Sequence, residues 1–216
     1  MSAASRNPVL LIHGIDDTNA IFCNMSLHLK ALGWPVYHLD LFPNDGAIGI
    51  DEMAGQIAEY VDRTFAAEQP IDLVGFSMGG LVSRYYVQRL GGIDRVQRFI
   101  TISSPHQGTW LAYFRFNVGC NQMRCGSAFL NDLNRDVSML EQINFTSIWT
   151  PMDLMIFPAH SSRMPVGQEI IVQVPLHSWM VSNANCWKAV VTALSEPLRP
   201  SRPPEQTLLP QKLQPS

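Results

Sequence analysis

The chain has 216 residues, of which 46% are hydrophobic and 15% charged, and its formal net charge is −3 at pH 7. This length fits one domain that buries about 70% of its unfolded surface. The charge argues against nucleic acid as a partner, and no apolar run is long enough to span a bilayer. So few charged residues indicate a mostly buried parallel sheet and favour an apolar substrate.

The N-terminal residues and the cysteines indicate in which cellular compartment we expect the protein. Residues 1–7 are polar and lack the apolar segment of a signal peptide, so we expect a disordered N-terminus and a cytoplasmic protein. Cys23, Cys120, Cys125 and Cys186 lack C-x-x-C spacing, and we expect no metal and no cofactor. Cys120 and Cys125 are expected to be reduced thiols, whereas Cys23 and Cys186 fall in helical patterns that predict burial.

The first strand is predicted at Pro8–His13, and it ends in His13-Gly14-Ile15. In acyl-transfer enzymes of this architecture, an apolar strand ending in His-Gly supplies one donor of the oxyanion hole. Gly14 allows a tight turn that would direct the Ile15 N–H toward the reacting carbonyl. His13 and Gly14 would then border the substrate. The alternative is an ordinary turn from strand to helix.

Two βα units follow from the hydrophobic periodicity. A helix is predicted at about Asn19–Leu32, a strand at Pro35–Leu41, and an amphipathic helix of about eighteen residues from Ile50. Alternation of strands and helices indicates right-handed crossovers and a parallel sheet.

The next strand, Ile71–Phe76, leads into Gly75-x-Ser77-x-Gly79 and then a helical pattern from Leu81. A strand, this spacing and a helix together predict a nucleophile elbow with Ser77 as the nucleophile. The Met78 N–H would be the second oxyanion donor. The alternative is a tight turn in which Ser77 only caps the helix.

A fourth strand is predicted at Val96–Ser103, and an insertion follows over residues 106–143. Its many large apolar side chains either cover the substrate or form a satellite core. By elimination, we place the acyl-binding wall here, with Trp110 and Phe114 contacting the substrate.

Two more strands, Phe145–Thr150 and Glu169–Val174, are each followed by a candidate catalytic residue, Asp153 and His177. A buried carboxylate needs a partner, and a histidine N–H would satisfy it. The alternative for Asp153 is a turn aspartate that caps local N–H groups.

Other residues compete for these two roles. His106 is assigned a structural role, and His160 lies in a loop that no strand anchors. Should Asp153 not be the acid, Asp132 and Asp136 are next in line. A closing helix is predicted at about Asn183–Leu194.

The order Ser77, Asp153, His177 is the order of α/β-hydrolases. The segments that carry these residues resemble the small α/β-hydrolase lipases, a group of minimal bacterial triacylglycerol lipases. Residues 103–109 resemble the Pro-His-x-Gly turn of bacterial true lipases. The resemblance implies an α/β-hydrolase fold with a reduced, doubly wound, mostly parallel sheet of about six strands and helices on both faces. Two departures are the missing signal peptide and Leu176, where a small residue commonly precedes the histidine.

The resemblance also implies a function. Ser77 would be the nucleophile, His177 the base and Asp153 its orienting acid, with the N–H groups of Ile15 and Met78 as the oxyanion hole. We expect a monomer that hydrolyses an ester or lipid and touches lipid surfaces transiently. An acyltransferase, a thioesterase or a catalytically silent lipid-binding protein are the alternatives.

The composition changes near the C-terminus. Six prolines and few apolar residues follow Ser195, which predicts a disordered tail over residues 196–216. The hydrolase domain is therefore expected to span residues 8–195.

Overall fold

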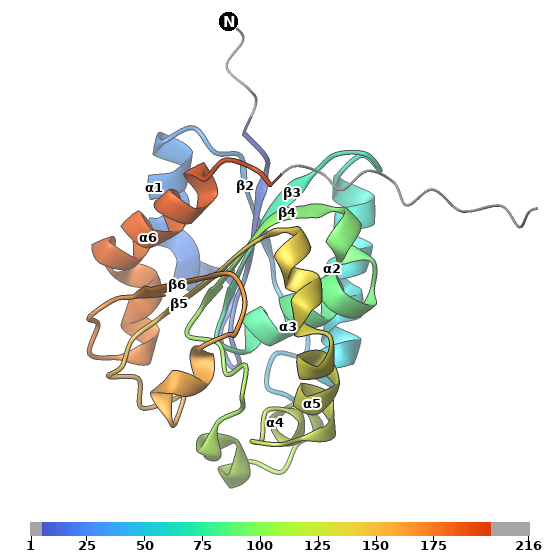
Figure 1. Ribbon diagram of the computed structural model, residues 1–216, viewed down its shortest axis with the longest axis vertical. Coiled ribbons are helices and arrows are strands. Elements are labelled where there is room, and N and C mark those ends of the chain that lie inside the picture. Colours follow the sequence, from blue (N-terminus) through green and yellow to red (C-terminus); the bar gives the residue numbers. More distant parts are fainter. Residues whose placement is uncertain (1–5, 200–216) are drawn as a thin grey trace, which may run out of the picture.

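A six-stranded parallel sheet organises the molecule (Figure 1). A computed structural model of the protein describes residues 6–199. Its strand order is β2-β1-β3-β4-β5-β6, and every neighbouring pair is parallel. The strands are β1 (Val9–Ile12), β2 (Val36–Leu39), β3 (Ile71–Phe76), β4 (Val96–Ile102), β5 (Asn144–Trp149) and β6 (Gln168–Ile171). The prediction of six strands in a parallel sheet is confirmed.

The strand order reverses between β1 and β3. After β1 the chain goes to β2 at one edge, and it then crosses back to β3 and continues to the other edge. In open α/β sheets, ligands bind outside the carboxyl ends of the strands at such a reversal. The turns after β1 and β3 carry Ile15 and Ser77, so the topology brings two predicted site residues to this point.

Helices cover both faces of the sheet, as predicted (Figure 1). Helices α2 and α3 pack on one face, and α1 and α6 on the other. The α-helices are α1 (Cys23–Ala31), α2 (Ile50–Thr64), α3 (Met78–Arg89), α4 (Val118–Gln122), α5 (Ala128–Arg135) and α6 (Ala184–Ser195). Short 3₁₀ segments are η1 (Asn19–Phe22), η2 (Gly92–Asp94), η3 (Trp110–Phe114), η4 (Val137–Gln142), η5 (Ala159–Ser162) and η6 (His177–Ser182).

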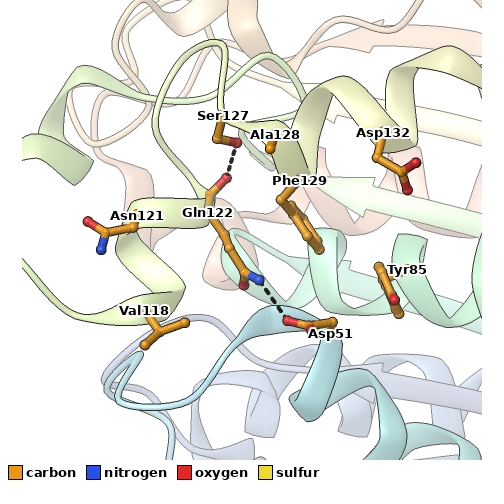
Figure 2. A pocket seen from close by; sticks show the side chains of 9 residues that line it. All are labelled: Asp51, Tyr85, Val118, Asn121, Gln122, Ser127, Ala128, Phe129 and Asp132. Atoms are coloured by element: carbon orange, nitrogen blue, oxygen red, sulfur yellow. Dashed lines mark hydrogen bonds between the residues drawn. The ribbon is translucent and has the colours of Figure 1, made fainter.

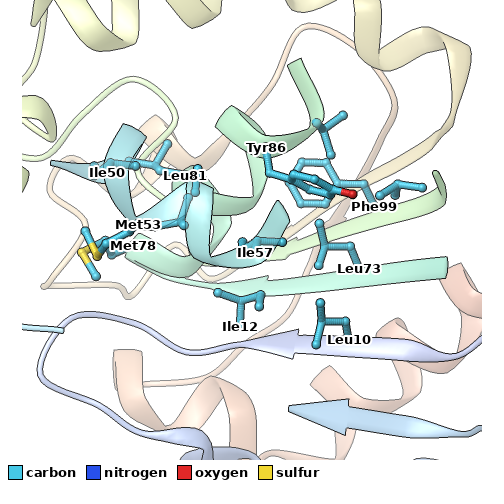
Figure 3. Packing of buried hydrophobic residues seen from close by; sticks show 14 of the residues in the cluster. Leu10, Ile12, Ile50, Met53, Ile57, Leu73, Met78, Leu81, Tyr86 and Phe99 are labelled. Atoms are coloured by element: carbon cyan, nitrogen blue, oxygen red, sulfur yellow. The ribbon is translucent and has the colours of Figure 1, made fainter. Parts of the chain in front are cut away.

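Two apolar clusters form because strand side chains alternate between the faces. On β1, Leu10 and Ile12 belong to the cluster beneath α2 and α3, whereas Val9 and Leu11 belong to the cluster beneath α1 and α6. Figure 3 shows the first cluster, where Ile50, Met53 and Ile57 of α2 pack over the sheet. Their spacing of three and four residues places them on one face of the helix.

The insertion over residues 106–143 has two different parts. Leu130 and Leu133 of α5 are buried, and Leu130 joins the larger cluster, so this part forms core. By contrast, Trp110, Phe114 and Phe116 are mainly exposed. The part around α5 therefore packs into the main core, and the part around Trp110 is largely exposed.

Other predictions need correction at particular residues. Cys23 is exposed at the start of α1, because the apolar stripe of that helix is formed by Met25 and Leu29 instead. Strand β6 begins and ends earlier than predicted. Most of the two segments predicted as disordered, 1–7 and 196–216, lies outside the described residues. Residues 196–199 are anchored, since Asn144 binds the Pro197 carbonyl and the Arg199 N–H at 2.9 and 3.1 Å.

Candidate active site

The turn between β3 and α3 holds Ser77 in a strained backbone conformation. Its φ is 54° and its ψ is −123°, a region that costs a non-glycine residue about 1–3 kcal/mol. The turn is possible because strand and helix approach closely. A Cβ on Gly75 would lie 2.6 Å from the Gly80 Cα, and one on Gly79 would lie 2.3 Å from the His13 carbonyl oxygen. This geometry is that of a nucleophile elbow.

Two backbone N–H groups near Ser77 lack a protein acceptor. Met78 begins α3, where the first N–H groups of a helix have no intrahelical partner. Within residues 6–199, neither the Met78 N–H nor the Ile15 N–H donates to another group of the protein. Ile15 lies on the lining of the same cavity as Ser77. The two N–H groups are therefore free for an external acceptor.

Asp153 and His177 form a buried pair. The His177 Nδ1 is 2.7 Å from the Asp153 Oδ2. The other carboxylate oxygen, Oδ1, accepts from the N–H groups of Met155 and Ile156, both at 2.9 Å. The carboxylate is only 1% exposed, yet three donors surround it. It orients the imidazole and can stabilise its protonated form.

The ring of His177 is also fixed by packing. Its centroid lies 4.8 Å from that of Phe76, the residue just before Ser77. With Nδ1 bound to Asp153, the other ring nitrogen, Nε2, has no partner among residues 6–199. Ser77 and His177 line one cavity although they are 100 residues apart in the sequence.

That cavity has a volume of about 520 Å³ and lies between the turn after β1, the insertion and the segment after Asp153. Its size is in the range of about 300–1,000 Å³ of small-molecule sites. Beyond Ser77, His177 and Ile15, the lining consists of Asp16, Asp17, Pro105, Thr109, Leu111, Ala112, Arg115, Cys120, Met123, Met155, Ile156, Leu176 and Ser178.

The four residues predicted to contact substrate do not line this cavity. Trp110 and Phe114 are 61% and 82% exposed, and their neighbours Leu111 and Ala112 face the cavity instead. A five-residue 3₁₀ segment has no apolar periodicity long enough to show which side faces inward. The wall residues Cys120 and Met123 had no separate signal in the sequence.

Predicted substrate contacts His13 and Gly14 are buried and support the turn. The Leu41 N–H donates to His13 Nε2 at 2.9 Å, so Nδ1 carries the proton and donates to the Gly14 carbonyl at 2.8 Å. A Cβ on Gly14 would lie 3.0 Å from the Ser77 Cβ. Both residues therefore fix the segment that carries the Ile15 N–H.

Neither competing histidine reaches the cavity. His106 is fully buried, and its Nε2 lies 3.0 Å from Thr101 Oγ1. Burial, assisted by the nearby Arg84 guanidinium, lowers the pKa of His106 well below its ordinary value. His160 is exposed in η5. The prediction that His106 is structural agrees with this environment.

A second cavity of about 450 Å³ lies between α2, α3, α4 and α5 (Figure 2). Several of its polar groups are already paired: Gln122 donates to Asp51 at 2.6 Å, and Arg89 binds Asp132 at 2.9 Å. Tyr85 stacks on Phe129 beside them. No nucleophile paired with a base is among the described residues that line this cavity.

Several large apolar side chains of the protein are exposed to solvent. They come from the loops at the carboxyl ends of the strands, and the most exposed are Phe116 (86%), Phe42 (82%), Phe114 (82%) and Leu154 (71%). Where exposed apolar groups form a contiguous patch, the patch often marks an interaction site. We call these four residues the apolar rim.

Residues 6–199 contain neither a candidate metal-binding cluster nor a helix able to span a membrane. In this range, no three His, Cys, Asp or Glu side chains are grouped closely enough to bind a metal ion. None of the helices that it contains combines the length and apolar character needed to cross a bilayer. All four cysteines are free thiols.

A family model described as palmitoyl protein thioesterase matches residues 8–126. The matched segment contains Ile15, Ser77 and Met78, and it ends before Asp153 and His177. The positions of the last two are therefore supported by the structure and not by this match.

Two curated relatives are triacylglycerol lipases, from Pseudarthrobacter phenanthrenivorans and Burkholderia plantarii. Each is 32% identical over 121 residues, which is 52% of this chain. The match covers only 37% and 33% of the two relatives, so the chain corresponds to about a third of their length.

Solved structures show the same fold. The mature form of a Bacillus licheniformis lipase has a TM-score of 0.74 at 14% identity, covering 89% of this chain and 93% of that one. Aspergillus fumigatus lipase B also has a TM-score of 0.74, at 19% identity, covering 88% of this chain and 53% of that one. The predicted α/β-hydrolase fold is thus confirmed.

Proposed function

Since the chain belongs to the palmitoyl protein thioesterase family, we propose that it is a serine hydrolase that cleaves carboxylic esters of apolar acyl groups. The observation that carries the proposal is the shared cavity: Ser77 and His177 both line it, and Asp153 binds His177 from behind at 2.7 Å. The predicted roles of all three residues are part of this proposal.

In the first half of the reaction, the Ser77 Oγ attacks the ester carbonyl while His177 Nε2 accepts the hydroxyl proton. The carbonyl oxygen becomes an oxyanion that accepts hydrogen bonds from the Ile15 and Met78 N–H groups. The carbon–oxygen bond to the alcohol then breaks. His177 gives its proton to the departing alcohol, and the acyl group remains on Ser77.

In the second half, water replaces the alcohol. His177 takes a proton from the water as its oxygen attacks the acyl carbon, and the same two N–H groups bind the second oxyanion. Collapse returns the proton to Ser77 and releases a carboxylic acid. Asp153 stabilises the imidazolium in both halves and is not itself protonated.

The apolar part of the cavity supports an apolar acyl group. Leu111, Ala112, Met123 and Ile156 present hydrocarbon close to the nucleophile. The apolar rim supports transient contact with a lipid surface, since its large apolar side chains are exposed in loops at the carboxyl ends of the strands. A lipid or small-molecule ester is the substrate class we propose.

A thioester is the second candidate, favoured by the family match over residues 8–126. The geometry at Ser77 suits either substrate, since the serine attacks the same acyl carbon whether oxygen or sulfur leaves. Rates on an oxygen ester and a thioester with the same acyl chain separate the two. Transfer to an added alcohol or thiol in place of water would identify an acyltransferase.

The test uses a fluorophosphonate probe and a p-nitrophenyl ester on the full chain. We expect Ser77 to be labelled, and we expect Ser77→Ala to lose labelling and about 10⁶-fold in turnover. Short and long acyl esters, compared below and above their solubility limits, define the preferred chain. Full activity of Ser77→Ala would refute the proposal, and an unlabelled, inactive wild type would indicate a silent lipid-binding protein.

A further inference from the structure

The turn after β1 carries two adjacent carboxylates, Asp16 and Asp17, and both line the cavity that contains Ser77. Asp16 is neutralised: the Arg115 guanidinium binds its two oxygens at 2.6 and 3.3 Å. This pair joins the turn to the insertion across 99 residues of sequence. Its two charges cancel, so it contributes little net charge to the cavity.

Asp17 has no such partner. Within residues 6–199, no arginine or lysine forms an ion pair with it. Its Oδ2 lies 3.3 Å from the point that a Cβ on Gly14 would occupy, and that same point is 3.0 Å from the Ser77 Cβ. The carboxylate is therefore close to the nucleophile and adds an unbalanced negative charge to the lining.

The backbone holds Asp17 in this place. Asp16 has a φ of 58°, a left-handed conformation that aspartate tolerates better than most residues. The Asp16 N–H donates to the Asn44 carbonyl at 2.9 Å, and the Asn44 side chain donates to the Asp17 carbonyl. Because the backbone is bound on both sides, the half-buried carboxylate is preorganised toward the cavity.

We propose that Asp17 makes the site select acyl esters or thioesters whose leaving group carries a positive charge near the scissile bond. The inference rests on the proposed function of Ser77. The apolar lining of Leu111, Ala112, Met123 and Ile156 suits the acyl chain, which leaves the side next to Asp17 for the alcohol or thiol. A cation there gains Coulomb energy that its uncharged isostere does not.

The ionisation of Asp17 depends on the groups that face it. Burial raises its pKa, the charges of His13 and His177 lower it, and that of Asp16 raises it. The direction is upward overall, so as pH falls Asp17 loses its charge earlier than an ordinary aspartate. Selectivity for a cation should then disappear at low pH.

The experiment compares octanoylthiocholine with S-3,3-dimethylbutyl thiooctanoate, which has a carbon in place of the charged nitrogen. We expect wild-type kcat/KM to favour the cation about three- to tenfold at neutral pH and low salt. Asp17→Asn should bring the ratio close to one, and Asp17→Lys should invert it. The matched control is Asp94→Asn, which removes an exposed carboxylate at the opposite edge of the sheet and should keep the wild-type ratio.

The outcomes separate this inference from the proposed function. If the neutral thioester is hydrolysed and Asp17→Asn leaves the ratio unchanged, the inference is wrong and the function of Ser77 stands. If the wild type hydrolyses neither substrate and the fluorophosphonate probe does not label Ser77, both fail. A ratio that also drops in Asp94→Asn would assign the effect to overall charge and overturn the role of Asp17.

Discussion

We call the side of the sheet where the parallel strands begin its amino edge, and the side where they end its carboxyl edge. At the amino edge, Asp72 is bound by the side chains of Asn7 and Arg98, at 3.0 and 3.2 Å. At the carboxyl edge, Asp153 is bound by two backbone N–H groups and by His177. Both aspartates are buried. Asp72 thus connects an N-terminal residue with β4, whereas Asp153 holds a side chain that faces a cavity. The same residue type serves stability at one edge and the candidate chemistry at the other.

Backbone strain distinguishes the two edges as well. Among residues 6–199, the non-glycine residues with positive φ are Asp16, Ser77 and Ser103. All three lie just after the carboxyl end of a strand, namely β1, β3 or β4. Strain of this kind persists only where surrounding structure over-determines it, and it gathers at functional sites. The carboxyl edge therefore costs stability that the rest of the sheet must supply.

Of the substitutions that test the difference between the two edges, Asp153→Asn is expected to have the largest effect, a loss of turnover. The asparagine oxygen can still accept from Met155 and Ile156, but its NH₂ group cannot accept from His177 Nδ1. The imidazole then favours the wrong tautomer, and we expect turnover of a p-nitrophenyl ester to fall about 10⁴-fold with little change in Tm.

The matched control for this substitution is Asp132→Asn. Asp132 is half-exposed and bound to Arg89, away from the cavity of Ser77, so nearly full activity is expected. If Asp153→Asn stays active while Asp132→Asn does not, the acid is Asp132 and the assignment of Asp153 is wrong.

The next effect concerns the elbow, where Gly79→Ala is expected to unfold the carboxyl edge. Its Cβ would lie 2.3 and 2.4 Å from the carbonyl oxygens of His13 and Ile12, and the backbone of β1 would have to move. We expect the free energy of unfolding, from urea titration, to fall by about 3 kcal/mol or more.

Gly55→Ala in α2 is the matched control, because nothing lies within 4 Å of the added Cβ. There the alanine should stabilise the helix by about 0.5–1 kcal/mol. Equal effects of the two substitutions would mean that close packing does not explain Gly79.

The features that sequence predicted best are those set by local pattern. Strand β3 and the turn at Ser77 follow from one apolar run and two glycines, and their bounds match the structure. Asp153 and His177 were found because each follows a strand of a parallel sheet, and such carboxyl ends meet at one edge. The two side chains do meet, at 2.7 Å, and their catalytic roles stay a prediction.

The features that sequence missed depend on contacts between distant segments. Arg115 neutralises Asp16 across 99 residues, and only this contact distinguishes Asp16 from Asp17. The inward side of η3 is set by anchors such as the Trp110 N–H, which donates to the Phe157 carbonyl at 2.8 Å. No periodic pattern encodes such contacts, so the residues that line the cavity could not be chosen from sequence.

The smallest predicted effect is at the amino edge, where Asp72 is expected to make the free energy of unfolding depend on pH. Burial outweighs the hydrogen bond from Asn7 and the charge of Arg98, and it raises the pKa of Asp72 to about 6. In the unfolded chain an aspartate has a pKa of about 3.9. Between these values the folded protein binds more protons than the unfolded chain, so the contribution of Asp72 to stability is highest below about pH 4 and declines as pH rises through about 6.

Asp72→Asn should remove this dependence. Urea titrations at several pH values should show that the wild type loses up to about 3 kcal/mol relative to the variant between pH 4 and 6, and that the difference is constant above pH 7. Asp94→Asn, an exposed carboxylate near the same edge, should show no such change. A wild type that instead gains stability over the variant as pH rises would mean that the charge of Arg98 outweighs the burial of Asp72.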